Sequence, residues 1–246
     1  MLHGILNYLQ EEEFIKKNEN GKWDITNLGA ILFAKNLNDF KNIKRKSIRV
    51  IQYDGKNKLK TIREEVGDKG YAIIFEGIIK YINTIIPKNE IIGEALRKEV
   101  SMYPELAIRE AVANSLVHQE FNISGTGPMV EIYTDRIEIT NPGKPLVKID
   151  RFIDNPPKSR NEQLASFLRR IGVCEERGSG FDKIVYSTEI YQLPAPKIEV
   201  YDEDTKVTLY AHMAYEDMSK EDKIRACYMH ACLKYVSNEH LTNASL

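Results

Sequence analysis

Residues 104–120 of this 246-residue chain read PELAIREAVANSLVHQE, and the stretch predicts a helix with a polar stripe beside an apolar one. Pro104 suits the first turn of a helix, where an N–H group has no partner to lose. At helical spacing Glu110, Asn114 and His118 share one face. A carboxylate can deprotonate water, and an amide oxygen can bind Mg²⁺. An ordinary amphipathic helix with a solvated side explains the same spacing, so both interpretations stay open.

Two shorter segments downstream also have the residue types of a ligand site. A predicted strand at 136–140 leads into Asn141-Pro142-Gly143, where an asparagine ends the strand and a glycine allows close approach to the backbone. Further on, Gly178-Ser179-Gly180 precedes a predicted helix, and N–H groups at a helix start can bind phosphate. Taken alone, both are ambiguous, because Asn-Pro opens many turns and two glycines make no dinucleotide motif.

The rest of the chain alternates irregularly between helical and extended patterns. Helices are predicted over 1–16, from 27 onward, and over 71–86, 104–118, 161–171, 181–191 and 220–236. Extended segments are predicted over 47–53, 58–66, 95–102, 128–133, 136–140, 197–200 and 207–212. Without a regular βαβ order, this mixture predicts a two-layer α+β architecture.

Composition and charge exclude several classes of protein. With 42% hydrophobic and 29% charged residues, the chain is not of a disordered or collagen-like type. Lys and Arg total 35 against 36 Asp and Glu, so contact with nucleic acid would need a local patch. One basic run fits either such a contact or, more simply, a solvated face: Lys41, Lys44, Arg45, Lys46 and Arg49. Three cysteines are too few for a disulfide framework, and we expect a cytoplasmic protein without a membrane span.

Three segments in this order resemble the GHKL, or Bergerat, fold of gyrase B subunits, histidine kinases and mismatch-repair ATPases. They are the E-x-x-x-N helix, the strand ending in Asn-Pro-Gly and the G-x-G before a helix. The phrases YPELAIREAVANSLVHQEF, DRIEITNPGKPL, SRNEQLASFLRR and CEERGSGFDKI are most similar to its divergent RecG-like C-terminal branch, in bacterial proteins described as transcriptional regulators or helicase-related. The segment WDITNLGAILFAK resembles the one that follows a Schlafen/AlbA-type DNA-binding module in such proteins.

The resemblance implies a division of the chain into three parts. A smaller α+β leading module would occupy residues 1–100, and a GHKL-like two-layer nucleotide-binding domain residues 101–212. The remaining residues, 213–246, resemble an incomplete winged-helix, or helix-turn-helix, segment. DNA would be contacted through flanking modules that are missing or truncated here, and a homodimer is an option.

The resemblance also implies ATP and Mg²⁺ as ligands and assigns roles to single residues. Glu110 matches the catalytic carboxylate that activates water, and Asn114 matches the Mg²⁺-binding asparagine. The residues implied for contact with the adenine ring are Asn141 and Gly143. Those implied for the phosphates are Gly178, Ser179 and Gly180. Further candidates for phosphate or lid contacts are Arg160 and Asn161.

One departure from the resembled family leaves two functions open. Asn141 stands where those proteins have an aspartate, and an amide lacks the charge-assisted bond of a carboxylate. The chain is either an ATP-binding, DNA-associated transcriptional regulator with slow Mg²⁺-dependent hydrolysis or a non-hydrolysing scaffold. In the second case a ligand-sensing, DNA-binding regulator has kept a degenerate nucleotide site, so enzymatic activity stays an open question.

Overall fold

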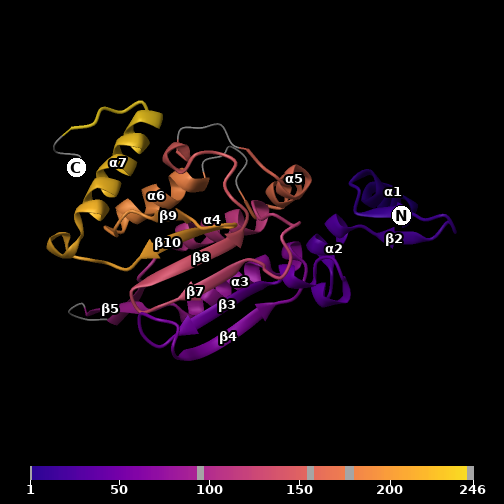
Figure 1. Cartoon of the computed structure of the whole chain (residues 1–246), viewed down its shortest axis with the longest axis horizontal. Coiled ribbons are helices and arrows are strands. Elements are labelled where there is room, and N and C mark those ends of the chain that lie inside the picture. Colours follow the sequence, from indigo (N-terminus) through magenta and orange to yellow (C-terminus); the bar gives the residue numbers. More distant parts are fainter. Residues whose placement is uncertain (1, 93–96, 154–157, 175–179, 243–246) are drawn as a thin grey trace.

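A six-stranded mixed sheet forms the centre of the computed structural model, which describes residues 2–92, 97–153, 158–174 and 180–242 (Figure 1). The strand order is β4-β3-β7-β8-β10-β9, in which β3 and β7 are parallel and the other neighbours are antiparallel. The strands are β3 (Ile48–Tyr53), β4 (Thr61–Gly67), β7 (Met129–Ile132), β8 (Arg136–Pro142), β9 (Lys197–Val200) and β10 (Asp204–Tyr210). The sheet and its helices confirm the predicted α+β class.

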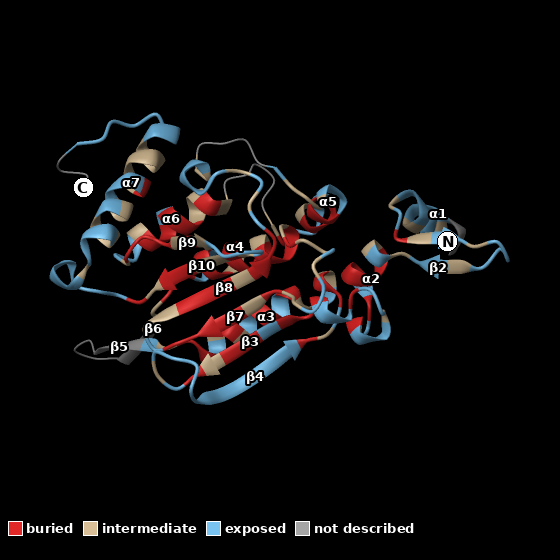
Figure 2. Ribbon diagram, in the orientation of Figure 1, coloured by how far each residue is buried: buried red, intermediate tan, exposed pale blue. Residues whose placement is uncertain are grey.

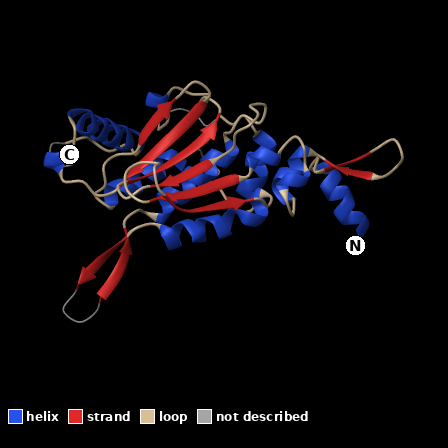
Figure 3. Ribbon diagram, turned by 60° about the horizontal axis from the view of Figure 1, so that its bottom comes forward, coloured by secondary structure: helices blue, strands red, loops and turns tan. Residues whose placement is uncertain are grey.

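Helices pack on one face of this sheet (Figure 3), and the other face carries charged side chains beside a small apolar cluster of Ile51, Tyr53 and Tyr133. On the covered face, alternate strand residues such as Val50, Val130 and Ile139 are buried in one apolar core with the helices. On the other face the long side chains pair, as in the ion pair of Arg49 with Glu64. The helices are α3 (Tyr71–Ile85), α4 (Glu105–Val117), α5 (Glu162–Arg170) and α6 (Gly180–Ile190).

Helix α4 is buried on most of its sides, which fixes it as the central helix of the layer (Figure 2). Pro104 is its N-cap residue, as the sequence predicts for a helix start. The amphipathic alternative is wrong, because Glu110 on the polar stripe is only 3% exposed. The Glu110 side chain therefore faces other parts of the protein.

The leading residues differ from the single helix predicted over 1–16. Helix α1 (Leu2–Glu11) ends early, since Glu13 has a positive φ of 59°, and β1 (Ile15–Lys17) pairs with β2 (Trp23–Ile25). Phe14 is buried, with its ring 5.1 Å from that of Phe167 on α5. Thr26 caps α2 (Asn27–Phe33) by accepting a hydrogen bond from the Gly29 N–H.

The sheet crosses residue 100, where the sequence predicts a domain boundary. Strands β3 and β4 come before it and the other four strands after it. Lys46 departs from the solvated face expected for the basic run: it is buried, and its Nζ donates to the backbone oxygens of Glu120 and Ile123. A separate hairpin is formed by β5 (Lys88–Ile92) and β6 (Arg97–Ser101), and short 3-10 turns by Leu37–Asp39, Lys44–Lys46, Ile149–Arg151 and Tyr215–Asp217.

At the C-terminal end, α7 (Lys220–Val236) packs against α6. Ser219 caps this helix, because its Oγ accepts from the Asp222 N–H at 3.1 Å. The pair Thr242-Asn243 is of a type that caps helices, but residues 243–246, where such a helix would begin, lie outside the described residues. Within the described ranges, no helix has both the length and the apolar character needed to cross a membrane.

Candidate functional site

A cavity of about 530 Å³ opens between α4, the end of β8, α5 and the start of α6. Its wall combines apolar side chains with a small number of charged and amide groups, which is the usual composition of a small-molecule site. Six residues predicted for the site lie in this wall: Glu110, Asn114, Asn141, Gly143, Arg160 and Gly180.

The first residue of α6 lies directly against the polar face of α4. A Cβ atom placed on Gly180 would lie 2.9 Å from the Glu110 Oε2 and 3.5 Å from the Asn114 Nδ2. The first N–H groups of a helix have no partner within it, and the helix start carries a partial positive charge. A buried carboxylate, an amide and a helix start therefore meet at one wall of the cavity.

Asn141 lies near the end of β8, opposite Thr205 of β10, and is buried. Its Nδ2 donates to the carbonyl oxygen of Pro142 at 3.2 Å. This bond uses one of the two Nδ2 hydrogens and orients the amide, with the Oδ1 as the acceptor available to another group. The strand continues through Asn141 and Pro142, beyond the end predicted at residue 140.

Gly143 follows with a φ of +111°, in a backbone region that favours glycine. Its N–H donates to the Glu203 oxygen, and its own oxygen accepts from the Thr205 Oγ1. A Cβ atom here would lie 2.7 Å from the Arg160 Nη1, so this position has no room for a side chain. Glycine is thus needed for both conformation and space.

Arg160 lines the cavity and joins three separate segments. Its Nη1 donates to the His118 oxygen at 3.1 Å, and its Nη2 donates to the Lys144 oxygen at 3.0 Å. Its Nε lies 3.1 Å from the Glu120 Oε2. The guanidinium therefore holds the residues after β8 against the C-terminal end of α4.

Asn161 has a different position from the one expected for a ligand contact. Its Nδ2 donates to the Val117 oxygen at 2.7 Å and to the Gln119 oxygen at 2.8 Å. It thus satisfies carbonyls at the end of α4, and it is not among the cavity-lining residues. Two other predicted residues, Gly178 and Ser179, lie outside the described residues.

His118 lines the cavity one turn beyond Asn114. Burial is the main cause that lowers the pKa of its imidazole, and the nearby Arg160 charge adds to this effect. A lowered pKa keeps the ring neutral at pH 7, so it can both donate and accept a hydrogen bond.

Several residues of the cavity wall have no signal in the sequence that marks them as site residues. Helix α5 supplies residues at i, i+3, i+4 and i+7. This spacing marks one face of the helix, but the sequence does not show that this face lies beside the site. The others come from loops and strands that are distant in sequence and carry no comparable signal. The missed residues include Leu146, Phe152, Lys158, Glu162, Ala165, Ser166, Arg169 and Thr205.

The donor set of the cavity fits Mg²⁺ better than a softer metal, because Glu110 and Asn114 offer carboxylate and amide oxygens. Among the described residues, no group of three or more His, Cys, Asp or Glu side chains is placed to hold a metal. A Mg²⁺ ion at this wall would therefore depend on ligand oxygens and water as well as on protein oxygens.

Comparison with known proteins supports a GHKL-like ATPase domain in the second half of the chain. Residues 125–209 match the family model described as "Putative ATP-dependent DNA helicase recG C-terminal". The match includes Asn141 and Gly180 and begins after Glu110 and Asn114. No curated protein matches the chain.

One similar crystal structure is that of the DIP2311 protein from Corynebacterium diphtheriae. It superimposes with a TM-score of 0.66 at 20% sequence identity, over 95% of this chain and 47% of that chain. At this identity the likeness is one of fold alone. The present chain corresponds to less than half the length of that protein.

Proposed function

We propose that this chain binds ATP with Mg²⁺ in the cavity, and that nucleotide binding serves a DNA-associated transcriptional regulator. The observation that carries the proposal is the position of Gly180 against Glu110 and Asn114, with Asn141 and Gly143 in the wall of the same cavity. The family-model match over residues 125–209 supports the ATP-binding part.

In this proposal the residues of α4 act on the phosphate end of the nucleotide. The Asn114 amide oxygen would hold Mg²⁺ together with phosphate oxygens, and the ion when bound neutralises phosphate charge. Glu110 would take a proton from the attacking water while the water oxygen bonds to the γ-phosphorus. The bond from that phosphorus to the bridging oxygen breaks, and its electron pair leaves with ADP.

The adenine ring of the nucleotide would lie toward Asn141 and Gly143. Since the Asn141 Nδ2 already donates to Pro142, its Oδ1 suits the amino group of adenine. The bond is neutral and weaker than the one a carboxylate makes. If the Asn141 Oδ1 accepts a hydrogen bond from adenine, Asn141→Ala lowers the affinity for ATP, because that acceptor is lost.

The second candidate function is a non-hydrolysing scaffold or ligand-sensing regulator with a degenerate nucleotide site. The asparagine in place of a carboxylate at position 141 favours it. Asn141→Asp separates the candidates: if it creates ATP binding that the native chain lacks, the native site is degenerate. If the native chain binds ATP and Asn141→Ala abolishes the binding, the site works as it stands.

Hydrolysis is tested on Glu110→Gln, which keeps the shape of the side chain and removes the proton acceptor. We expect phosphate release to fall by about two orders of magnitude or more, while ATP binding is retained. Equal release by Glu110→Gln and the native chain would exclude Glu110 as the base.

The location of the nucleotide can be checked with the native cysteines. Cys174 lines the cavity, whereas Cys227 is exposed on α7. Saturating Mg²⁺-ATP should slow alkylation of Cys174 and leave Cys227 unaffected, as measured by mass spectrometry of the two peptides. Protection of neither cysteine by bound ATP would place the nucleotide elsewhere.

The DNA-associated role is a separate part of the proposal. It draws on the likeness of residues 213–246 to the start of a winged helix and on the Ser219-capped helix α7 within them. A mobility-shift titration with duplex DNA, with and without ATP, tests it. No shift by a chain that also contains the flanking modules would remove this part and leave the nucleotide site untouched.

A further inference from the structure

Helix α5 turns one face toward the cavity, and that face ends in an arginine. The cavity-lining residues of α5 follow one side of a helix, at i, i+3, i+4 and i+7. They are Glu162, Ala165, Ser166 and Arg169. Other residues of α5 anchor the helix: Leu164 and Leu168 are in the core, and the Phe167 ring makes edge contacts with Phe14 and Phe33. Packing therefore fixes the direction in which Arg169 extends.

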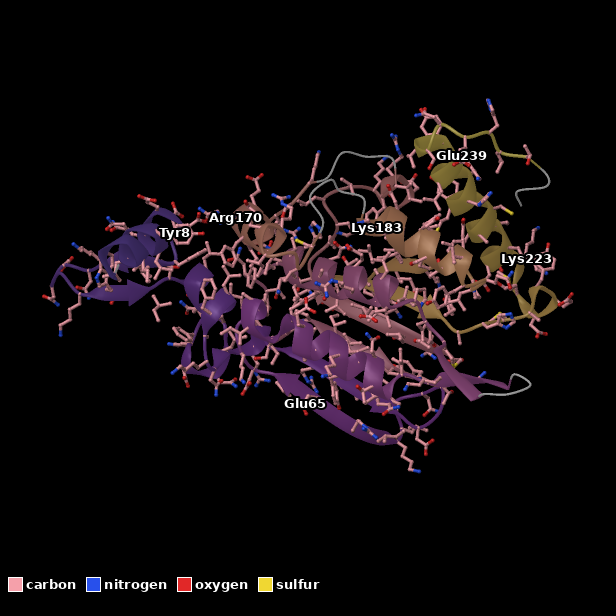
Figure 4. The ribbon with its side chains drawn as sticks, turned by 180° about the vertical axis from the view of Figure 1, so that it is seen from behind. Tyr8, Glu65, Arg170, Lys183, Lys223 and Glu239 are labelled. Atoms are coloured by element: carbon pink, nitrogen blue, oxygen red, sulfur yellow. The ribbon has the colours of Figure 1, made fainter. Side chains whose placement is uncertain are left out.

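Three arginines lie on α5 or just before it, and two of them are bonded to protein groups. Arg160 donates to two carbonyl oxygens and pairs with Glu120. Arg170 donates through both terminal nitrogens to the Glu12 carboxylate. In Figure 4, seen from behind, Arg170 lies on the side of α5 toward α1, which carries Tyr8.

Arg169 differs from Arg160 and Arg170 in its contacts with protein groups. Its side chain is half-buried and lines the cavity, and within the described residues it has no hydrogen bond or ion pair. Glu162, the carboxylate on the same face, is seven residues away, or about 10 Å along the helix axis, which is too far to pair. A guanidinium with five donors and, among the described residues, no acidic partner suits an anionic ligand.

The position of Arg169 in the chain points to the phosphate end of a nucleotide. In the part of the chain that the structure describes, the next cavity-lining residues in sequence are Cys174 and Gly180, and Gly180 lies against Glu110 and Asn114. The phosphate chain is the strongly anionic part of ATP, and paired N–H groups of arginine match phosphate oxygens. We propose that Arg169 binds the terminal phosphates of the nucleotide, an inference that rests on the proposed function.

The test compares ATP and adenosine binding to Arg169→Gln by titration calorimetry in the presence of Mg²⁺. We expect ATP affinity to fall at least about tenfold, because a charged contact to phosphate is lost, and adenosine affinity to stay unchanged. Arg169→Lys, which keeps the charge, should recover part of the loss. Arg170→Gln is the matched control, since it removes the same charge one residue away and outside the cavity wall.

Each other result has a defined meaning. Equal ATP affinity of Arg169→Gln and the native chain overturns the inference and leaves the proposed function intact. An equal loss for ATP and adenosine, or an equal loss in Arg170→Gln, also overturns it, because the effect would then be structural or nonspecific. A native chain that binds neither ligand overturns the inference and the proposed function together.

Discussion

At Gly180, an added methyl group would press directly on the carboxylate of the candidate site. In Gly180→Ala the new Cβ would lie 2.9 Å from the Glu110 Oε2, so the carboxylate must move. We expect phosphate release to fall by roughly a hundredfold, as is typical of a displacement of about 1 Å at a reacting group. The melting temperature should change little, because alanine is favourable in a helix and the displaced atom ends a flexible side chain.

Gly77→Ala is the matched control for this prediction. Gly77 lies in α3, and a Cβ there would meet nothing within 4 Å. This variant should keep the native rate of phosphate release and gain roughly 1 kcal/mol of stability. A Gly180→Ala variant as active as Gly77→Ala would show that the Glu110 carboxylate does not need its observed position.

His118 should make stability depend on pH. Its folded-state pKa is lowered from 6.5, mainly by burial and then by Arg160. The unfolded chain therefore binds this proton more readily, and stability is lost as the pH falls from about 6.5 toward the folded pKa. Between pH 7.5 and 5.5, the native chain should lose more unfolding free energy than His118→Gln, by up to about 1.4 kcal/mol per pH unit.

Urea unfolding of both chains at several pH values measures this difference. Above about pH 6.5 the two curves should run parallel, since the imidazole is neutral in both the folded and the unfolded chain. Parallel curves over the whole range would mean that burial does not shift the His118 proton equilibrium.

Helix α5 depends on three aromatic rings that come from distant parts of the chain. Phe14, Phe33 and Phe167 lie with ring centroids 5.1 to 5.2 Å apart in edge-to-face pairs. Phe167→Ala should lower the unfolding free energy by about 3 kcal/mol and weaken ATP binding, because α5 also carries the cavity residues Ser166 and Arg169.

Phe167→Leu separates packing from aromatic contact, since it keeps most of the volume and should cost less than about 1.5 kcal/mol. Chemical unfolding gives both values. If Phe167→Ala lost stability without any change in ATP affinity, α5 would not be part of the nucleotide site.

The sequence predicts most elements of the fold but not how they pair. Helices α3, α4 and α7 are near their predicted bounds because they combine apolar periodicity with a proline or a serine cap. Strands β1 and β2 have three residues each, which is too short for alternation to be visible. The parallel pairing of β3 with β7 joins residues far apart in the chain, and no local pattern encodes it.

The same limit applies to the site. Glu110 and Asn114 were visible because both lie on one helix face, and Asn141 and Gly143 because a strand ends there. Lys46 was expected on a solvated face, yet it is buried against two backbone oxygens that come more than 70 residues later. Such contacts depend on tertiary position, so composition and spacing cannot reveal them.

At the scale of the whole molecule, the sheet and its core join residues on both sides of position 100. A fragment of residues 101–246 would lack β3 and β4 on the sheet and α3 beneath it (Figure 1). It would expose core residues such as Val130 and Ile108, so we expect it not to unfold cooperatively in urea.

A chain ending at residue 236 is the control for truncation, since it removes only residues after α7. It should unfold with the native midpoint within error. A cooperative transition in the 101–246 fragment would instead support the domain boundary that the sequence predicts at residue 100.

The most direct test of the nucleotide site is titration calorimetry of the native chain with ATP and Mg²⁺, repeated on Asn114→Ala. We expect a dissociation constant on the order of micromolar for the native chain and a loss of most of the binding heat in Asn114→Ala, because a Mg²⁺ ligand is removed. The absence of binding up to millimolar ATP by the folded native chain would contradict it.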